Sequence, residues 1–162
     1  MIEQLAVLRS RILQELAQAQ QIVNRVERAM NAAAQDTVNQ DLLLDSVALN
    51  MHDYYSVIER VLERIASVVD RTSPRGFDWH RELLSQMTVD VPDLRPPVIS
   101  PATAERLDEF LRFRHVVRNV YAFELDRDRI ERLVGQLRPT SERVTRELQK
   151  FADLLKDLAR QA

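Results

Sequence analysis

The chain contains no cysteine, only two glycines in 162 residues, and no long run of apolar side chains. The lack of cysteine excludes disulfides, thiolate metal sites and cysteine nucleophiles. A glycine-rich phosphate loop is excluded as well, because Gly76 and Gly135 stand alone. No apolar run is long enough to cross a bilayer, and Glu3 does not fit the start of a signal peptide. We therefore expect a cytoplasmic protein without a membrane segment.

The sequence also lacks histidines and acids at the spacing that a metal site in a helical bundle requires. A carboxylate metal site in a helical bundle calls for a Glu-x-x-His spacing on an inward face, and none of the three histidines has a glutamate at that distance. We expect no metal and no other cofactor. The net charge of −2 argues against a protein that coats nucleic acid, so a site for a polyanion must be local.

The residues that are present fit a helical protein. Apolar residues make up 45% and charged residues 30% of the chain, a balance that suits a single globular domain over 1–162. Helical periodicity runs from Ile2 to about Met30 and again from Leu44 to about Asp70. Between them, Thr37 and Gln40 have the spacing of a capping box that starts a new helix. These segments predict a long antiparallel hairpin.

Prolines divide the second half of the chain. A short helix is expected over 78–87, followed by a rigid, proline-rich crossover over 89–100. Ser100 as N-cap and Pro101 at the first helical position predict a helix that extends to about residue 123.

The last part of the chain is expected to contain a short helical continuation over 126–135 and a final helix opened by Pro139. The prediction is an all-α antiparallel bundle of four to five main helices and one short helix.

The stretch FRHVVRNVYAFELD, residues 113–126, concentrates side chains that bind phosphate or move protons. At about 100° per residue from Arg114, Arg118 lies near 40°, His115 near 100° and Asn119 near 140°, so these groups share one face of a helix. The valines and phenylalanines of the stretch lie on the other face. With Arg112, the arginines and the histidine span a segment without an acid, which favours binding of a polyanion.

Two interpretations of this helix differ in what covers its polar face: acids of the same helix, or another helix. In the first, the arginines pair with acids near them in the sequence, such as Asp108. Arg114 and Arg118 weaken that interpretation, because like charges four residues apart repel one another. Leu107 and Leu111 continue the same face as an apolar patch, which suggests contact with another helix, either in the bundle or in a second copy of the chain.

Other candidates have simpler interpretations. His52 is expected to have a structural role at or near the surface, and Tyr54 and Tyr55 to be packing residues. Trp79, at the start of the short helix with His80, either plugs the end of the bundle or forms a wall of the site on the 113–126 helix.

The pattern Arg114-x4-Asn119-x-Tyr121 resembles the Arg-x4-His-x-Tyr signature of the HEPN superfamily, in the version of HepT-type toxins. The resemblance covers nearly the whole chain. It includes the long hairpin, the WHRELL-x-x-M segment, the RPPVIS crossover and the FRHVVRNVYAFELD helix followed by one closing helix.

The resemblance implies a metal-independent ribonuclease toxin that cuts tRNA or mRNA at a composite site. That site forms where two copies of the 101–123 helix meet in a homodimer. In this family the arginine, here Arg114, stabilises charge at phosphorus, and the histidine moves a proton to or from the ribose 2′-oxygen. The tyrosine, here Tyr121, receives AMP from an MntA-type nucleotidyltransferase antitoxin.

Asn119 stands where the family has its catalytic histidine. An amide can hold the same hydrogen bond but cannot transfer a proton near neutral pH. Three outcomes follow: His115 supplies the proton transfer, the activity is low, or the protein binds RNA or its partner without cutting. A purely structural bundle is a further alternative, but it leaves the arginine cluster without a role.

Overall fold

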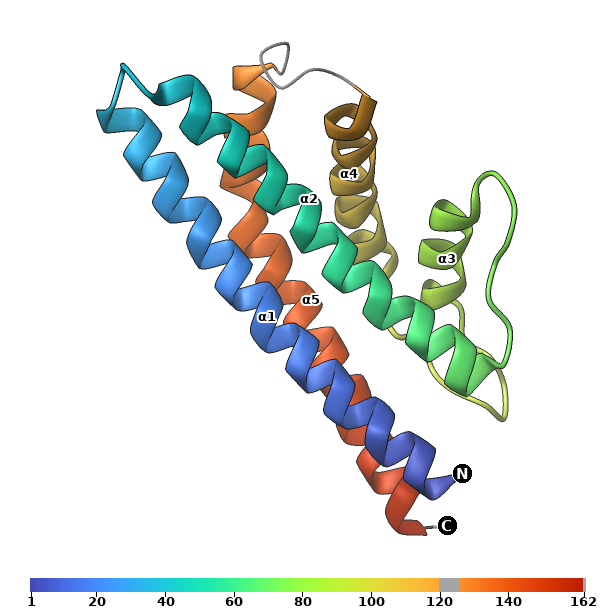
Figure 1. Ribbon diagram of the computed structural model, residues 1–162. Helices are drawn as coiled ribbons and strands as arrows, with labels where there is room; N and C mark the ends of the chain where they lie inside the picture. Colours follow the sequence, from blue (N-terminus) through green and yellow to red (C-terminus); the bar gives the residue numbers. More distant parts are fainter. Residues whose placement is uncertain (120–125, 162) are drawn as a thin grey trace.

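The computed structural model describes residues 1–119 and 126–161, and these residues form helices joined by loops (Figure 1). The helices are α1 (Ile2–Gln35), α2 (Gln40–Ile65), α3 (Trp79–Thr88), α4 (Pro101–Asn119) and α5 (Arg127–Gln161). A π-helical turn, η1 (Ala66–Asp70), extends α2. The predicted all-α bundle is confirmed, and the described part of the chain contains no strand beyond an isolated bridge between Val91 and Arg95.

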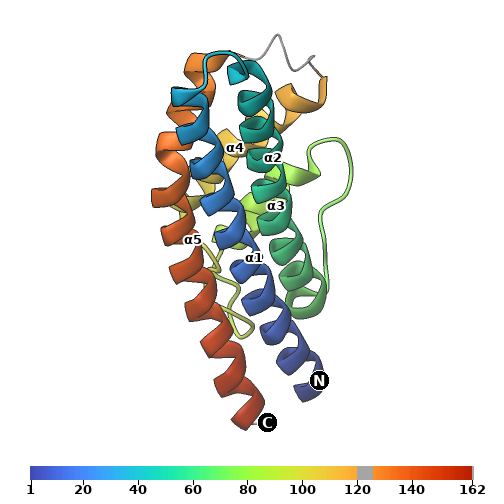
Figure 2. The same cartoon turned by 60° about the vertical axis from the view of Figure 1, so that its left-hand side comes forward.

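Helices α1 and α2 form the predicted hairpin, and α5 lies along both of them (Figures 1 and 2). The apolar stripe of α1 is buried as its spacing predicts, for instance at Ile12 and Val23, and faces buried residues of α2 such as Met51 and Ile58. Helix α1 ends five residues later than expected, at Gln35 rather than about Met30.

The turn between α1 and α2 corrects the capping-box prediction. Helix α2 begins at Gln40 after Asn39, and no side chain caps it. Asp36 organises the turn instead, since its Oδ1 accepts hydrogen bonds from the backbone N–H groups of Val38 and Asn39. The Gln40 side chain donates back to the carbonyl of Ala33 at 2.7 Å. An Asx turn at Asp36 therefore takes the place of the capping box predicted at Thr37.

The predicted crossover between α3 and α4 is held by a buried arginine. Arg95 donates through Nε and Nη2 to Asp70 at 2.5 and 2.6 Å. Its remaining hydrogen bonds go to the backbone carbonyls of Val89, Pro96 and Gln86. The loop therefore has a fixed path, which sets where α4 starts.

Helix α4 starts as predicted, at Pro101, with the Oγ of Ser100 accepting a hydrogen bond from the N–H of Thr103 at 3.2 Å. The prediction for the last part of the chain is wrong in one respect. Pro139 does not open a helix but lies inside α5, which is continuous for 35 residues. Apolar residues on both sides of it, Leu133, Leu137 and Val144, are buried in one core, and this packing outweighs the local cost of proline.

The site region lies on the side of α2 away from α1. There α4 runs antiparallel to α2, and α3 packs against α4 and the end of α2 (Figures 1 and 2). The two termini lie near one another at the far end of the long helices (Figure 1). Among the helices of 1–119 and 126–161, none is both long and apolar enough to cross a membrane.

Candidate functional site

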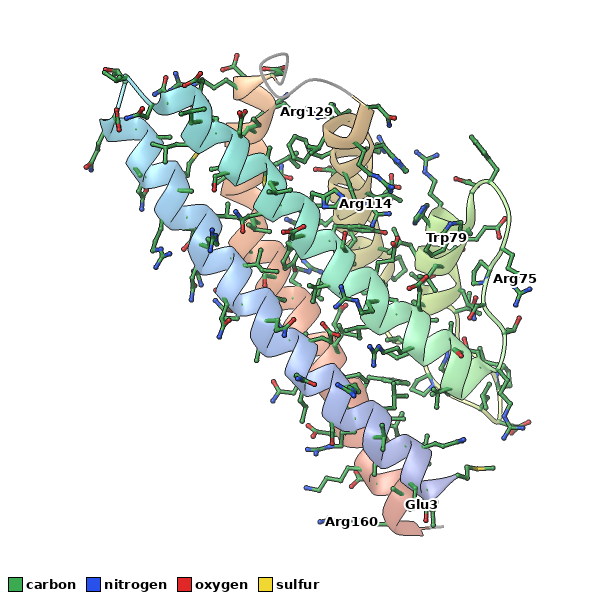
Figure 3. The ribbon with its side chains drawn as sticks, viewed as in Figure 1. Glu3, Arg75, Trp79, Arg114, Arg129 and Arg160 are labelled. Carbon is green, nitrogen blue, oxygen red and sulfur yellow. The ribbon has the colours of Figure 1, made fainter. Side chains whose placement is uncertain are left out.

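Arg114 points into the protein. Its side chain is only 5% exposed, and Nη1 lies 2.9 Å from Oε1 of Glu59 on α2. Nη2 lies 3.4 Å from the second oxygen of Glu59, and the hydroxyl of Ser56 is 3.4 Å from Nη1. The guanidinium also lies over the ring of Tyr55, 4.8 Å from its centroid. Figure 3 shows Arg114 on α4 beside α2.

This position corrects the expected geometry of the polar face. Arg114, Arg118, His115 and Asn119 do not point together toward a partner, because Arg114 is buried between α4 and α2 while the other residues are exposed. The acid that pairs with Arg114 is 55 residues away in the sequence, on another helix. Spacing within α4 therefore could not identify it.

Glu59 serves two partners. Besides Arg114 it contacts His80, whose Nδ1 lies 2.7 Å from Oε2 of Glu59. The indole of Trp79 stacks on the imidazole of His80, with ring centroids 3.7 Å apart. Helices α2, α3 and α4 thus meet at one buried carboxylate. We call Glu59, His80 and Arg114 the buried triad.

The contacts of His80 favour a proton on one of its two ring nitrogens. Nδ1 lies 2.7 Å from Oε2 of Glu59 and 3.0 Å from Nη2 of Arg114. A guanidinium only donates and a carboxylate only accepts, so a single ring nitrogen cannot satisfy both. The shorter contact, to a charged acceptor, favours a proton on Nδ1 that is donated to Glu59. In the neutral ring, Nε2 is then the proton acceptor.

His115 is next to the buried triad but is exposed. Its ring lies edge-on to that of His80, with centroids 5.7 Å apart. Burial lowers the pKa of His115 from 6.5, and the neighbouring His80, Arg114 and Arg118 lower it further, against Glu59, which raises it. Two imidazoles and two guanidinium groups therefore gather at one place, where they suit a phosphate group.

Asn119 is exposed and bonds to its own helix, since its Nδ2 donates to the carbonyl of His115 at 2.7 Å. Within one chain it is not brought together with Arg114. Tyr121 lies outside the residues that the structure describes.

Arg112 lies on another side of α4. It pairs with Asp108 one turn earlier, with Nη2 2.6 Å from Oδ2. It also borders a groove of about 330 Å³ between α4 and α5. The residues that line this groove are Glu109, Arg112, Arg129, Arg132, Leu133 and Gln136. We call it the arginine groove.

A model of the HepT-like protein family matches residues 46–155, about two thirds of the chain, from α2 to the last turns of α5. The chain belongs to the HepT-like family. It is accordingly a member of the HEPN superfamily that its α4 sequence resembles. Searches of curated proteins and of solved structures returned no match. Every residue of the buried triad lies inside the HepT-like range, whereas α1 lies outside it.

The HepT-like α4 has less exposed apolar surface than expected. Leu107 and Leu111 were predicted to form an exposed patch, but they are 0% and 1% exposed in the core of their own chain. Helix α4 packs against α2, α3 and α5, and its buried residues include Leu107 and Leu111. The sequence left open whether these leucines contact a helix of the same bundle or of a second copy, and the structure shows that they pack within their own bundle.

Two members of the buried triad cannot be assigned from the α4 motif. Glu59 lies on α2 outside that motif, and the sequence places His80 only in the short helix that could form a wall of the site. A signal was present on α2 of this HepT-like chain, where His52, Ser56, Glu59 and Glu63 recur every three or four residues as a polar stripe beside the apolar one. Such spacing puts them on one face, and that face packs toward α4.

The two tyrosines and His52 lie where the sequence predicts. Tyr54 and Tyr55 are buried packing residues, and burial raises the pKa of Tyr54 to about 12. His52 is partly exposed and contacts its neighbour Asp53 at 3.2 Å. Trp79 is half-buried and stacks on His80, beside the buried triad. Across 1–119 and 126–161, no cluster of histidine and acidic residues has the arrangement of a metal site.

Proposed function

We propose that this HepT-like protein is a metal-independent ribonuclease of the toxin type, which cleaves tRNA or mRNA. The observation that carries this proposal is the gathering of Arg114, Arg118, His80 and His115 at the meeting point of α2, α3 and α4. Positive charge at this place would stabilise the charge that develops at phosphorus. The imidazoles of His80 and His115 are available for the proton transfer that Asn119 cannot perform.

The roles proposed for the motif residues follow their positions. Arg118 is exposed and binds the phosphate directly, while Arg114 contributes positive charge from the buried side and holds the site together through Glu59. Asn119 positions the substrate through a hydrogen bond. Arg112, at the arginine groove, contacts a neighbouring phosphate of the RNA. A homodimer through α4 would bring Asn119 of one copy toward the exposed Arg118 of the other.

Cleavage without metal tests this function. Purified protein, incubated with bulk tRNA or a single-stranded RNA in the presence of EDTA, should shorten the RNA, and Arg114→Ala should abolish the reaction. The matched control is Arg138→Ala, because Arg138 also pairs with a glutamate of another helix, Glu27, at 2.6 Å but lies outside the site. If the wild-type protein cleaves neither RNA at a large excess of protein, the proposed function is wrong.

A second candidate function is a non-catalytic module of the same fold that binds RNA or a partner. Two observations favour it: Glu59 already neutralises Arg114, and Asn119 replaces the histidine of the motif. Such a protein would dimerise and bind without cutting. The substitution Asn119→His separates the two functions, since it should create cleavage activity in a non-catalytic module. In an enzyme that uses another imidazole, it should have a much smaller effect.

We also propose a nucleotidyltransferase antitoxin of the MntA type as partner, with Tyr121 as the residue that it modifies with AMP. This proposal rests on membership of the HepT-like family and on the motif position of Tyr121. Co-expression with a nucleotidyltransferase encoded by the adjacent gene should give a HepT-like protein heavier by one AMP group. Tyr121→Phe should prevent that increase in mass without preventing complex formation.

A further inference from the structure

His80 on α3 is held in a way that distinguishes it from His115. Its Nδ1 donates to Glu59 at 2.7 Å, and Trp79 covers one face of its ring. Its side chain is 18% exposed. Nε2 has no hydrogen bond to a described residue, and it is not one of the buried polar atoms, so it is open to solvent. The ring therefore has a fixed orientation with one accessible nitrogen. His115 makes no hydrogen bond through its ring within the described residues.

A carboxylate that accepts the proton of one imidazole nitrogen fixes the tautomer and makes the other nitrogen a proton acceptor. A general base needs a nitrogen that is placed within reach of the proton and is basic enough to accept it, and this arrangement provides both. Glu59 is well placed to provide it, since its side chain is only 8% exposed and Arg114 pairs with its other oxygen, Oε1, at 2.9 Å. The same carboxylate thus orients the base and the cation of the site.

We propose that His80 is the catalytic base of this chain and replaces the motif histidine whose position Asn119 occupies. Nε2 of His80 takes the proton of the ribose 2′-hydroxyl while the 2′-oxygen forms a bond to phosphorus. The bond from phosphorus to the 5′-oxygen breaks, and water protonates that oxygen. The proton on His80 then returns to solvent. The products are a 2′,3′-cyclic phosphate and a 5′-hydroxyl, and Glu59 acts as a positioning residue.

This inference deepens the proposed function and rests on it. The charged groups around His80 come from two helices: Glu59 and Glu63 from α2, and Arg114 and His115 from α4. A purely structural His80, which only fixes Glu59, predicts a different response to substitution than a base does. The difference lies in Nε2, because Glu59 and Arg114 are reached only through Nδ1.

Two substitutions separate the roles. His80→Asn keeps an N–H near the position of Nδ1, so it preserves the hydrogen bond to Glu59 and removes Nε2. His80→Gln instead places an amide near Nε2. If His80 is the base, both variants lose about 10²–10⁴-fold in cleavage rate, and the limb of the pH–rate profile that reports the base disappears. His115→Gln should lose less than either of them.

The substrate should be a 5′-labelled single-stranded RNA, with a fully 2′-deoxy copy as a control that remains uncut. Thermal unfolding and the oligomeric state of each variant should be measured, so that rates refer to folded protein. His80→Ala with added imidazoles of different pKa provides a second route, since a recovered rate that follows the pKa of the added imidazole requires a base rather than a structural contact. Wild-type cleavage that persists in His80→Asn with an unchanged pH profile overturns the role of His80 alone. Lack of cleavage by the wild-type protein overturns the proposed function and this role with it.

Discussion

Two buried arginines, Arg95 and Arg114, are each 4% exposed, yet they are satisfied very differently. Arg95 forms two hydrogen bonds with Asp70 and directs the rest of its donors to the backbone carbonyls of Val89 and Pro96 in the crossover and of Gln86 in α3. Arg114 leaves its Nε without a partner and shares Glu59 with His80. All hydrogen-bond donors of Arg95 therefore have acceptors, whereas Arg114 has one donor without an acceptor and shares its carboxylate with a histidine.

The difference distinguishes a structural arginine from one in a candidate site. A buried ion pair whose hydrogen bonds are all made holds a loop in place and has nothing left for a ligand. A carboxylate that holds both an arginine and a histidine is costly to assemble and fits a chemical role. We therefore expect substitutions at Arg95 to act on stability and those at Arg114 to act chiefly on activity.

The largest expected effect is that of Arg114→Ala on RNA cleavage. Loss of a positive group that stabilises charge at phosphorus should lower the rate by at least about 10²–10³-fold. The rate should be measured per folded molecule, with the folded fraction from circular dichroism. Arg114→Lys should recover only part of the loss, because lysine cannot contact both oxygens of Glu59 in the same way. Full activity in Arg114→Ala would remove the distinction between the two arginines.

The next effect concerns Arg95. Replacing it by Met leaves Asp70 buried without its partner and should lower the free energy of unfolding by about 3–5 kcal/mol. Urea unfolding measures this change. Cleavage per folded molecule should remain near the wild-type value, and the double variant with Asp70→Leu should recover part of the stability. A drop in specific activity as large as that of Arg114→Ala would show that the crossover is coupled to the site.

A smaller effect is expected at the arginine groove. Arg132→Gln should weaken RNA binding and reduce the salt dependence of log Kd by about 0.7 for one lost contact to single-stranded RNA. The measurement is a salt titration of binding by fluorescence anisotropy. Arg160→Gln serves as the control, since Arg160 lies on the same helix at the opposite end of the molecule (Figure 3). An equal effect of both substitutions would mean that binding depends on overall charge rather than on the groove.

The smallest effect concerns pH and His115. The pKa of His115 is lowered from 6.5, so the folded state binds fewer protons than the unfolded state as the pH falls through this range. Stability should therefore decrease from about pH 7.5 to about pH 5.5, and His115→Gln should show a smaller decrease. Urea midpoints of both proteins at the two pH values test this sign. A steeper decrease in the variant would contradict it.

The helices of this chain were predictable because their signals are local. The stripe through Ile12 and Val23, and the start at Ser100 and Pro101, depend on residues within a few positions of one another. The break expected at Pro139 was wrong because packing on both sides of it, which is not local, keeps α5 continuous.

The site was predictable only in part, for the same reason. The sequence indicates the α4 stretch of a HepT-like chain. The functional roles of its residues stay predictions, at Arg112, Arg114, His115, Arg118, Asn119 and Tyr121. A helical wheel gives angles but not neighbours, so it could not show that α4 is covered on several sides. For that reason it placed Leu107 and Arg114 on an open face. Glu59 and His80 come from other helices, and only the fold brings them to Arg114.

The widened turn of η1 after Ile65 gives the chain a place where its length can change. Its hydrogen bonding includes one from the N–H of Thr72 to the carbonyl of Ala66, a longer span than an α-helix uses. Deleting Val68 would restore ordinary helical spacing, because the widened turn accommodates one extra residue. Glu59 lies before the turn and would keep its position, and Asp70 would keep nearly its present direction. A one-residue deletion there should therefore preserve both the ion pair of Asp70 with Arg95 and the position of Glu59.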